Sequence, residues 1–173
     1  MLSLREVFAS FKDSGCSVLT LEDSLPEGAQ RVDFVVVGSV YADTTAGARH
    51  VQSLETACAH LSAGAKLLCS CPDDFEVTQA GFMKFGSPGL ASTFLEKVTG
   101  SGSYILGKPN PWALREAWDQ MVEHFGGPAM GLRFSDALYV GDSLATDVSL
   151  ALQHEMDSAL VLSGTTSRAD LAS

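Results

Sequence analysis

The chain has 173 residues, of which 46% are hydrophobic, and a formal net charge of −10 at pH 7. This length allows one domain or two small ones, and the hydrophobic content predicts a packed core instead of a disordered chain. The negative charge argues against nucleic acid and anionic membrane surfaces as partners, and no apolar run is long enough to cross a membrane.

The first hundred residues are expected to alternate between helix and strand. Apolar residues at helical spacing predict a first helix that ends at Gly15. After it the pattern predicts strands at residues 16–21, 31–37 and 67–71, helices at residues 44–62 and 88–98, and a loop at residues 73–86.

The alternation continues in the remaining residues. The pattern predicts a strand at 103–106, a helix at 112–125 with Leu114, Trp118, Met121 and Phe125 inward, and apolar strands at 137–140 and 159–162 with a helix between them. Strands that alternate with helices favour right-handed crossovers and a mainly parallel sheet. The predicted fold class is therefore α/β.

An acidic loop follows the apolar strand at 137–140. Asp142 comes one residue after the strand, next to Gly141, and Asp147 lies five residues further on. Ligands of open α/β sheets bind at the carboxyl ends of the strands, and carboxylates are ligands that Mg²⁺ accepts. The two residues are candidate ligands or supports of a magnesium ion. The alternative, which is as plausible for Asp147 by itself, is that they only cap the following helix.

Lys108 follows the strand at 103–106 and precedes a helix. A lysine in this position supplies a positive charge to a phosphate or a carboxylate. The alternative is an ordinary solvated loop lysine. We expect the strands before Lys108 and Asp142 to be neighbours in one sheet, which would bring the two side chains close together at the carboxyl ends of these strands.

Together these segments resemble a known family. GKPNP at 107–111, YVGDSLATDV at 139–148 and VLSGTT at 161–166 are similar to the third and fourth motifs of haloacid dehalogenase-like phosphatases, of the p-nitrophenylphosphatase and phosphoglycolate phosphatase type. The segments from VDFVVVGSVYADT to FGSPGLASTFLEKVTG resemble the class IIA cap of that subfamily. The resemblance implies an α/β cap domain at 1–102 and the C-terminal half of a Rossmann-like core at 103–173.

The same resemblance implies roles for individual residues. Asp142 and Asp147 would belong to the Mg²⁺ site, Lys108 would be catalytic and pair with the nucleophile and the phosphate, and Asp73 would face the substrate from the cap. The family has an asparagine where Cys71 stands, and a solvated acidic turn is an equally good interpretation of Asp73. The expected activity is Mg²⁺-dependent hydrolysis of a small phosphorylated metabolite.

The sequence also departs from the family, because it contains no D-x-D-G motif and hence no recognisable nucleophile. Whether the chain is an enzyme therefore stays open, and a fragment that is inactive by itself is expected. The alternative is a non-catalytic module of cap and half-core that dimerises or binds a partner, since caps of this subfamily often mediate dimers. The four cysteines are interpreted as small buried hydrophobic residues in a reducing compartment, and the first residues lack a secretory signal, so we expect a cytoplasmic location.

Overall fold

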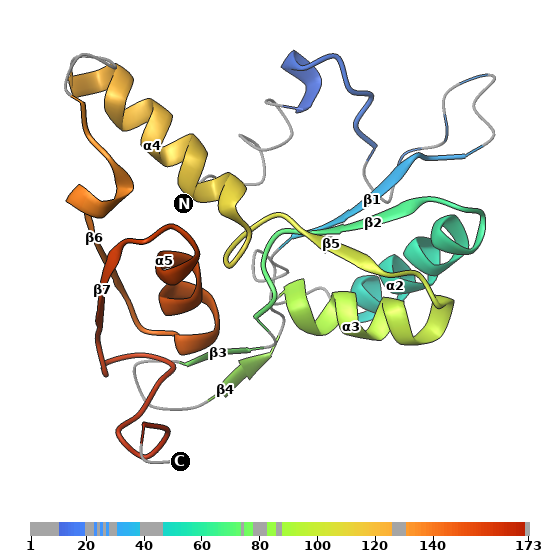
Figure 1. Ribbon diagram of the computed structural model, residues 1–173. Coiled ribbons are helices and arrows are strands. Elements are labelled where there is room, and N and C mark those ends of the chain that lie inside the picture. The colour runs from blue at the N-terminus through green and yellow to red at the C-terminus, as the bar shows by residue number, and fades with distance from the viewer. Residues whose placement is uncertain are drawn as a thin grey trace.

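The computed structural model describes residues 11–19, 23, 25, 27, 31–38, 47–73, 75–77, 83–85, 88–125 and 131–171. Figure 1 shows two parallel sheets in separate parts of the molecule, with helices packed beside them. The predicted α/β class with parallel strands is confirmed. Within the described residues, no helix is long and apolar enough to cross a membrane.

The first sheet has the strand order β1-β2-β5 and is parallel throughout. Parallel neighbours need a crossover connection, and helices rich in apolar residues supply it here. The strands are β1 (Phe34–Val37), β2 (Lys66–Cys69) and β5 (Ser103–Ile105), and the helices are α2 (Gly47–Ser62) and α3 (Pro88–Thr99).

One face of this sheet forms the main hydrophobic core. Leu67 of β2 is buried together with Leu61 at the end of α2 and Leu95 of α3. Successive strand residues point to opposite faces, so Phe34 and Val36 of β1 lie on the other face, where they are 58% and 47% exposed. In Figure 1 both helices lie on the same side of the sheet, and among the described residues no helix layer covers this second face.

Two expectations for the first hundred residues are wrong. Residues 16–19 form no strand, although residues 11–13 are helical and Gly15 ends that helix with a φ of +82°. The expected loop at 73–86 contains an antiparallel hairpin of β3 (Phe75–Val77) and β4 (Met83–Phe85). Three-residue strands are too short to give a clear period-two pattern, which explains why the hairpin was not predicted.

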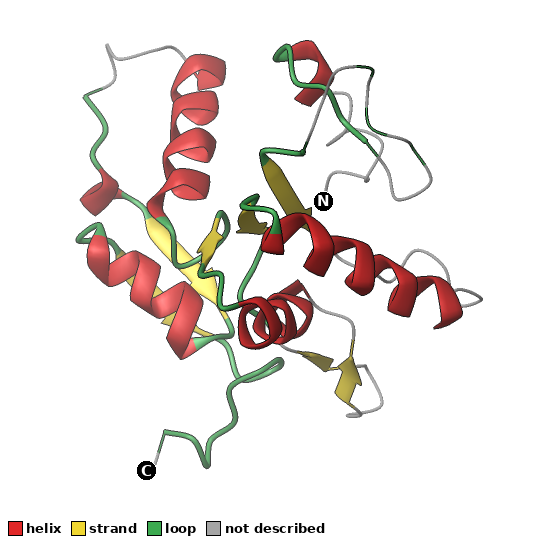
Figure 2. Ribbon diagram, turned by 90° about the vertical axis from the view of Figure 1, so that its right-hand side faces the viewer, coloured by secondary structure: helices red, strands yellow, loops and turns green. Residues whose placement is uncertain are grey.

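The second sheet consists of β6 (Leu138–Gly141) and β7 (Asp157–Leu160), which are parallel. A π-helix, η3 (Leu144–Val148), continues directly into the short helix α5 (Ser149–Gln153), and the two connect the strands. Leu150 and Ala151 are buried here, whereas Leu152 is 70% exposed. After β7 the chain runs as a loop, visible in Figure 2.

Helix α4 (Pro111–Phe125) connects the two parts and buries none of its residues completely. Leu114, Trp118 and Met121 are half-buried, but Phe125 is 67% exposed, so its predicted inward position is wrong. The Trp118 ring packs on Phe134 of the short 3-10 helix η2 (Phe134–Asp136), with ring centroids 4.5 Å apart. This contact fixes α4 beside the segment that leads into β6.

The strands before Lys108 and Asp142 are not neighbours in one sheet. β5 pairs with β2, whereas β6 pairs with β7, so that expectation is wrong. The sequence of a strand as short as β5, Ser-Tyr-Ile, does not determine which sheet the strand joins. The division at 102/103 stays a prediction, and β5, just after that boundary, belongs to the first sheet.

Candidate active site

Lys108 is positioned by the parallel pairing of β2 and β5. The backbone leaves β2 and β5 at the same end of the sheet, because the two strands are parallel. Just beyond them, the Leu106 amide donates a hydrogen bond to the Cys69 carbonyl at 2.8 Å. At Gly107 a Cβ atom would lie 2.3 Å from the Ser70 carbonyl oxygen, so only glycine allows the two backbones to approach this closely. Lys108 therefore projects from the carboxyl edge of the first sheet.

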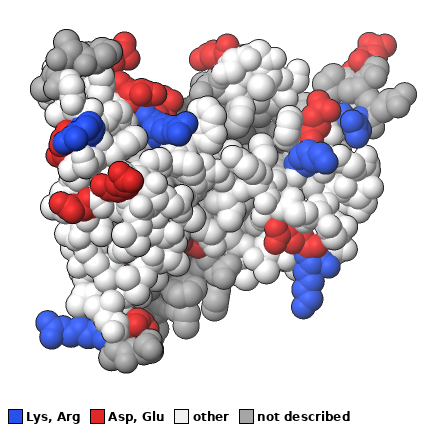
Figure 3. All heavy atoms as spheres, viewed as in Figure 1, with Lys and Arg blue, Asp and Glu red and all other residues white. Residues whose placement is uncertain are grey.

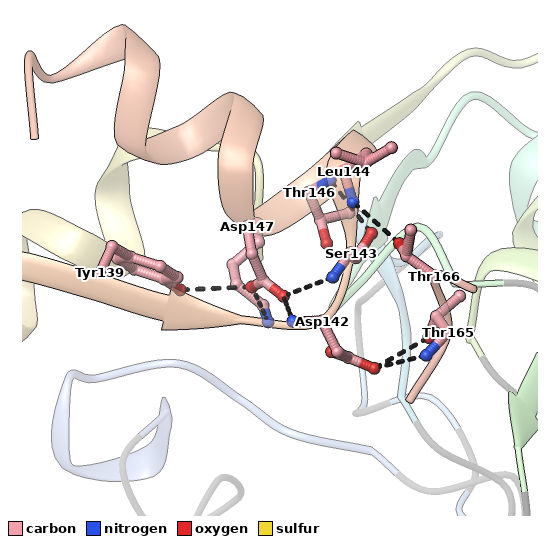
Figure 4. A network of polar contacts seen from close by, with 9 residues as sticks. Tyr139, Asp142, Ser143, Leu144, Thr146, Asp147, Thr165 and Thr166 are labelled. Atoms are coloured by element: carbon pink, nitrogen blue, oxygen red, sulfur yellow. Dashed lines mark hydrogen bonds and ion pairs between the residues drawn. The ribbon is translucent and has the colours of Figure 1, made fainter. Parts of the chain in front are cut away.

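The acidic loop is built around the carboxylate of Asp147. Its Oδ2 accepts hydrogen bonds from the backbone amides of Asp142 at 3.0 Å and Ser143 at 3.1 Å. A Cβ at Gly141 would lie 2.3 Å from the Asp147 Cγ, so the glycine makes room for this carboxylate. Figure 4 shows Asp147 turned back towards the end of β6.

Lys108 and Asp147 join the two motifs. The Lys108 Nζ lies 2.5 Å from the Asp147 Oδ1, and the side chains are 44% and 3% exposed. The Tyr139 hydroxyl lies 3.5 Å from the same oxygen. Both Asp147 oxygens are therefore engaged by protein groups, which suits a support better than a direct metal ligand.

The pKa values of this pair shift in opposite directions. Burial alone would raise the pKa of Asp147, but the Lys108 ammonium and the backbone amides outweigh it and lower the pKa. Burial alone would lower the pKa of Lys108, but the hydrogen bond and charge of Asp147 outweigh it and raise the pKa. Both shifts favour the charged forms, so the pair is ionised at neutral pH.

Asp142 lies at the end of β6 and is held differently. Its Oδ2 accepts hydrogen bonds from the Thr165 backbone amide at 2.7 Å and the Thr165 hydroxyl at 3.1 Å. Among the described residues, every hydrogen bond to this carboxylate ends on Oδ2, which leaves Oδ1 for a ligand. Thr165 was not among the predicted site residues, although it lies in the VLSGTT segment at 161–166 that carries part of the family resemblance.

Asp73 lies just after β2 and is exposed. Its charge contributes to the raised pKa of Lys108, behind the larger effects of burial and Asp147. Its carbonyl oxygen accepts from the Gly89 amide at 3.0 Å, which fixes the backbone at this point against the start of α3. The structure thus brings Lys108, Asp147 and Asp142 together by direct contacts and puts Asp73 within electrostatic reach of Lys108.

The oxygen donors of this site fit a cation that keeps most of its own water. In the part of the chain that the structure describes, no three His, Cys, Asp or Glu side chains form a group that could hold a metal ion. Mg²⁺ commonly binds through one or two carboxylates together with water and substrate phosphate. The free Oδ1 of Asp142 fits such a site, and the fit for a metal that needs a complete protein cage is poor.

Comparisons with known proteins connect this geometry to a family. Residues 105–173 match the HAD-hydrolase-like family model. The chain is 28% identical over 141 residues to the ribonucleotide monophosphatase NagD of Escherichia coli K12, covering 82% of this chain and 48% of that protein. It is 29% identical over 147 residues to the 5′-nucleotidase YutF of Bacillus subtilis, covering 85% of this chain and 51% of that protein. The chain spans about half the length of the curated relatives it matches.

Solved structures show the same architecture. A 4-nitrophenylphosphatase of Thermotoga maritima superposes with a TM-score of 0.67 at 28% identity, covering 96% of this chain and 54% of that one. A thermostable phosphatase (NPPase) of Geobacillus stearothermophilus, at 22% identity, shares the fold with a TM-score of 0.66 over 94% of this chain and 56% of that one. The part that contains Lys108, Asp142 and Asp147 matches the HAD-hydrolase-like family model, and the chain as a whole is similar in sequence and fold to phosphatases.

Proposed function

We propose that the protein containing this chain hydrolyses phosphate monoesters of small metabolites with the help of Mg²⁺. The observation that carries the proposal is the ion pair between Lys108 and Asp147, because it joins two motifs that are 39 residues apart into one charged site. Phosphatases of this family generally use a divalent metal, and the choice of Mg²⁺ rests on the oxygen donors of Asp142. Free cysteines support a cytoplasmic location.

In this proposal Asp142 holds the metal through Oδ1, and Asp147 holds the backbone of Asp142 in place. A bound Mg²⁺ supplies positive charge that offsets the charge on the transferring phosphoryl group. Lys108 has three donor protons, and Asp147 accepts one of them within the described residues. Because the Lys108 side chain is partly exposed, its other two protons are free to contact a phosphate oxygen.

The attacking group follows from the family resemblance. There an aspartate carboxylate attacks phosphorus, the alcohol leaves with a proton, and water then hydrolyses the aspartyl phosphate to inorganic phosphate. The sequence has no D-x-D-G motif, and Asp142 and Asp147 already hold hydrogen bonds with other groups. We infer that these 173 residues provide stabilisation of charge and not the attack.

Asp73 is proposed to contact the substrate away from its phosphate. A carboxylate accepts hydrogen bonds, so it suits the hydroxyl groups of a substrate and repels a phosphate. Two of the relatives, by their names, act on substrates that carry hydroxyl groups: a ribonucleotide monophosphatase and a dihydroxyacetone phosphatase. We therefore place the hydroxyl-bearing end of the substrate near Asp73 and the phosphate near Lys108.

Titration calorimetry with MgCl₂ tests the proposal. Wild type is expected to bind Mg²⁺ weakly, and Asp142→Asn is expected to lose this binding because its charge is removed. Asp119→Asn is the matched control, since Asp119 is an exposed acid on α4 away from the site. Equal Mg²⁺ affinity in wild type and Asp142→Asn would contradict the assigned role of Asp142.

A second candidate function, a module that binds a partner or a second copy, is favoured by exposed apolar strand residues. Val36 and Tyr104 lie on the open face of the first sheet, and Leu138 and Val140 lie on one face of β6. Uncharged side chains also cover most of the face shown in Figure 3. Light scattering at several concentrations of wild type and of Leu138→Lys tests this function, and a wild-type monomer at every concentration would contradict it.

A further inference from the structure

We propose that Gly164 and Thr165 fix the rotamer of the Asp142 carboxylate, so that only its Oδ1 faces the bound cation and the site prefers Mg²⁺ to Ca²⁺. The cation part of this inference rests on the proposed function. Thr165 is thus a positioning residue that acts through Asp142 and does not touch the reacting atoms.

The contacts of Thr165 favour one carboxylate oxygen. Its backbone amide and its hydroxyl donate to the same atom, Oδ2 of Asp142, at 2.7 Å and 3.1 Å. Hydrogen bonds to a charged acceptor are stronger than those between neutral groups. Figure 4 shows both bonds meeting at one end of the Asp142 side chain, away from Asp147.

The backbone that presents Thr165 is itself anchored on both sides. Before it, the Val161 amide donates to the Gly141 carbonyl at 2.8 Å. After it, the amide of the buried Thr166 donates to the Asp142 carbonyl at 3.0 Å, and its hydroxyl accepts from the Leu144 amide at 3.4 Å. Thr165 is therefore held at a fixed distance from Asp142 even though its own side chain is exposed.

Gly164 leaves the space that the carboxylate occupies. A Cβ atom at this position would lie 1.8 Å from the Asp142 Oδ2 and 2.6 Å from its Cγ, and its three nearest atoms all belong to the Asp142 side chain. Alanine would therefore collide with the end of a flexible side chain and not with backbone. Rotation of Asp142 relieves most of this collision, so Gly164→Ala should displace the carboxylate while the fold is kept.

The occupied Oδ2 has a consequence for the choice of metal. Ca²⁺ binds carboxylates through one or both oxygens in flexible geometries, whereas Mg²⁺ requires near-octahedral geometry and keeps several waters. A carboxylate that offers one oxygen in a fixed direction suits Mg²⁺. When the carboxylate is released, both oxygens become available and the preference for Mg²⁺ over Ca²⁺ should fall.

The experiment compares Mg²⁺ and Ca²⁺ affinities by calorimetry in four variants. Gly164→Ala and Thr165→Val are expected to bind Mg²⁺ about 10-fold more weakly than wild type, as is common when a residue that orients a metal ligand is changed. Ca²⁺ affinity should change less, so the ratio of the two affinities falls. Thr165→Ser keeps the hydroxyl and should restore the wild-type ratio. Gly102→Ala is the control, because a Cβ at Gly102 would meet no atom within 4 Å.

Two further measurements separate positioning from folding and from the proposed function. The melting temperature of metal-free Gly164→Ala should match that of Gly102→Ala. Amide exchange of Thr165, measured by NMR without metal, should be slow in wild type and fast in Asp142→Ala and Gly164→Ala. This readout tests the contact between Thr165 and Asp142 independently of any cation.

The outcomes distinguish the two proposals. If Asp142→Asn loses Mg²⁺ binding but Gly164→Ala and Thr165→Val keep the wild-type affinity ratio, the positioning role is wrong and the metal site stands. If Asp142→Asn binds Mg²⁺ as wild type does, the metal site is wrong and so is the preference derived from it. Rapid exchange of the Thr165 amide in wild type would contradict the fixed carboxylate directly.

Discussion

The two sheets of this molecule bury different kinds of residue. Around the first sheet the buried side chains are almost all apolar, as in Leu67 and Leu95, with Ser92 as a buried hydroxyl. Around the second sheet Asp147, Thr146 and Thr166 are buried beside Leu150 and Ala151. Buried polar groups cost free energy unless they are hydrogen-bonded, and Asp147 and Thr166 are hydrogen-bonded here, so the stability of the second sheet depends on these polar contacts.

The largest effect that this comparison predicts is on the first sheet. Leu67→Ala removes a fully buried side chain and leaves a cavity, which should lower the free energy of unfolding by about 3 kcal/mol. Urea unfolding followed by circular dichroism measures it. Leu152→Ala, at a 70% exposed position, is the control and should cost much less. Equal losses in the two variants would mean that the first sheet does not hold the core.

The next effect concerns the buried carboxylate of the second sheet. Asp147→Asn removes the charge that pairs with Lys108, and we expect a loss of about 2 kcal/mol, below the usual cost for a fully buried pair because Lys108 is partly exposed. Mg²⁺ affinity should fall as well, because Asp147 holds the backbone of Asp142. Asp157→Asn, at an exposed site on β7, is the control. Unchanged stability and affinity in Asp147→Asn would contradict the role of this pair.

A smaller effect is expected in the dependence of stability on pH. The lowered pKa of Asp147 stabilises the fold above the ordinary carboxyl pKa of about 3.9 and is lost as pH falls through the folded-state value. The raised pKa of Lys108 stabilises the fold below the ordinary pKa of about 10.4 and is lost as pH rises through its folded-state value.

Wild type should therefore exceed Lys108→Met in stability by up to about 1 kcal/mol between these limits, since Lys108 is partly exposed. At more acidic or more alkaline pH, one partner of the ion pair loses its charge, so the difference in stability between the two proteins should shrink. Thermal unfolding of the two proteins over a series of buffers measures the difference. A gap that stays constant from acidic to alkaline pH would show that the ion pair does not contribute to stability.

The smallest signal is expected in catalysis. The purified 173-residue chain should not hydrolyse p-nitrophenyl phosphate above background, because charge stabilisation without a nucleophile gives only a small part of a full rate enhancement. A colorimetric assay with and without MgCl₂ measures it. Mg²⁺-dependent turnover that disappears in Asp142→Asn would mean that the chain contains a nucleophile we have not identified.

The charged site could be predicted from the sequence because its residues follow strand ends. Asp142 and Lys108 each come after an apolar run, and the pattern of strand, glycine and polar residue is local. The fold class could also be predicted from a local pattern, the alternation of helix and strand along the chain. These features depend on neighbours in the sequence and not on distant contacts.

The features that were missed depend on contacts between distant residues. The pairing of β5 with β2 is decided by tertiary packing, which a three-residue strand does not encode. Thr165 contacts Asp142 across 23 positions, and an exposed threonine after a strand gives no local sign of that role. Phe125 fits the apolar period of α4, but no described element covers it, so periodicity predicted a burial that did not occur.

The attachment of Lys108 to the first sheet has a mechanical consequence. Lys108 comes three residues after the last residue of β5, and its neighbour Gly107 is packed against the backbone of Ser70, so Lys108 moves with the first sheet. Its partner Asp147 is held by the backbone at the end of β6 and moves with the second sheet. A movement that separates these two attachment points would lengthen this ion pair. The charge balance at the end of β6 therefore depends on how the two sheets are held against each other, since Lys108 neutralises Asp147 only while both stay in contact.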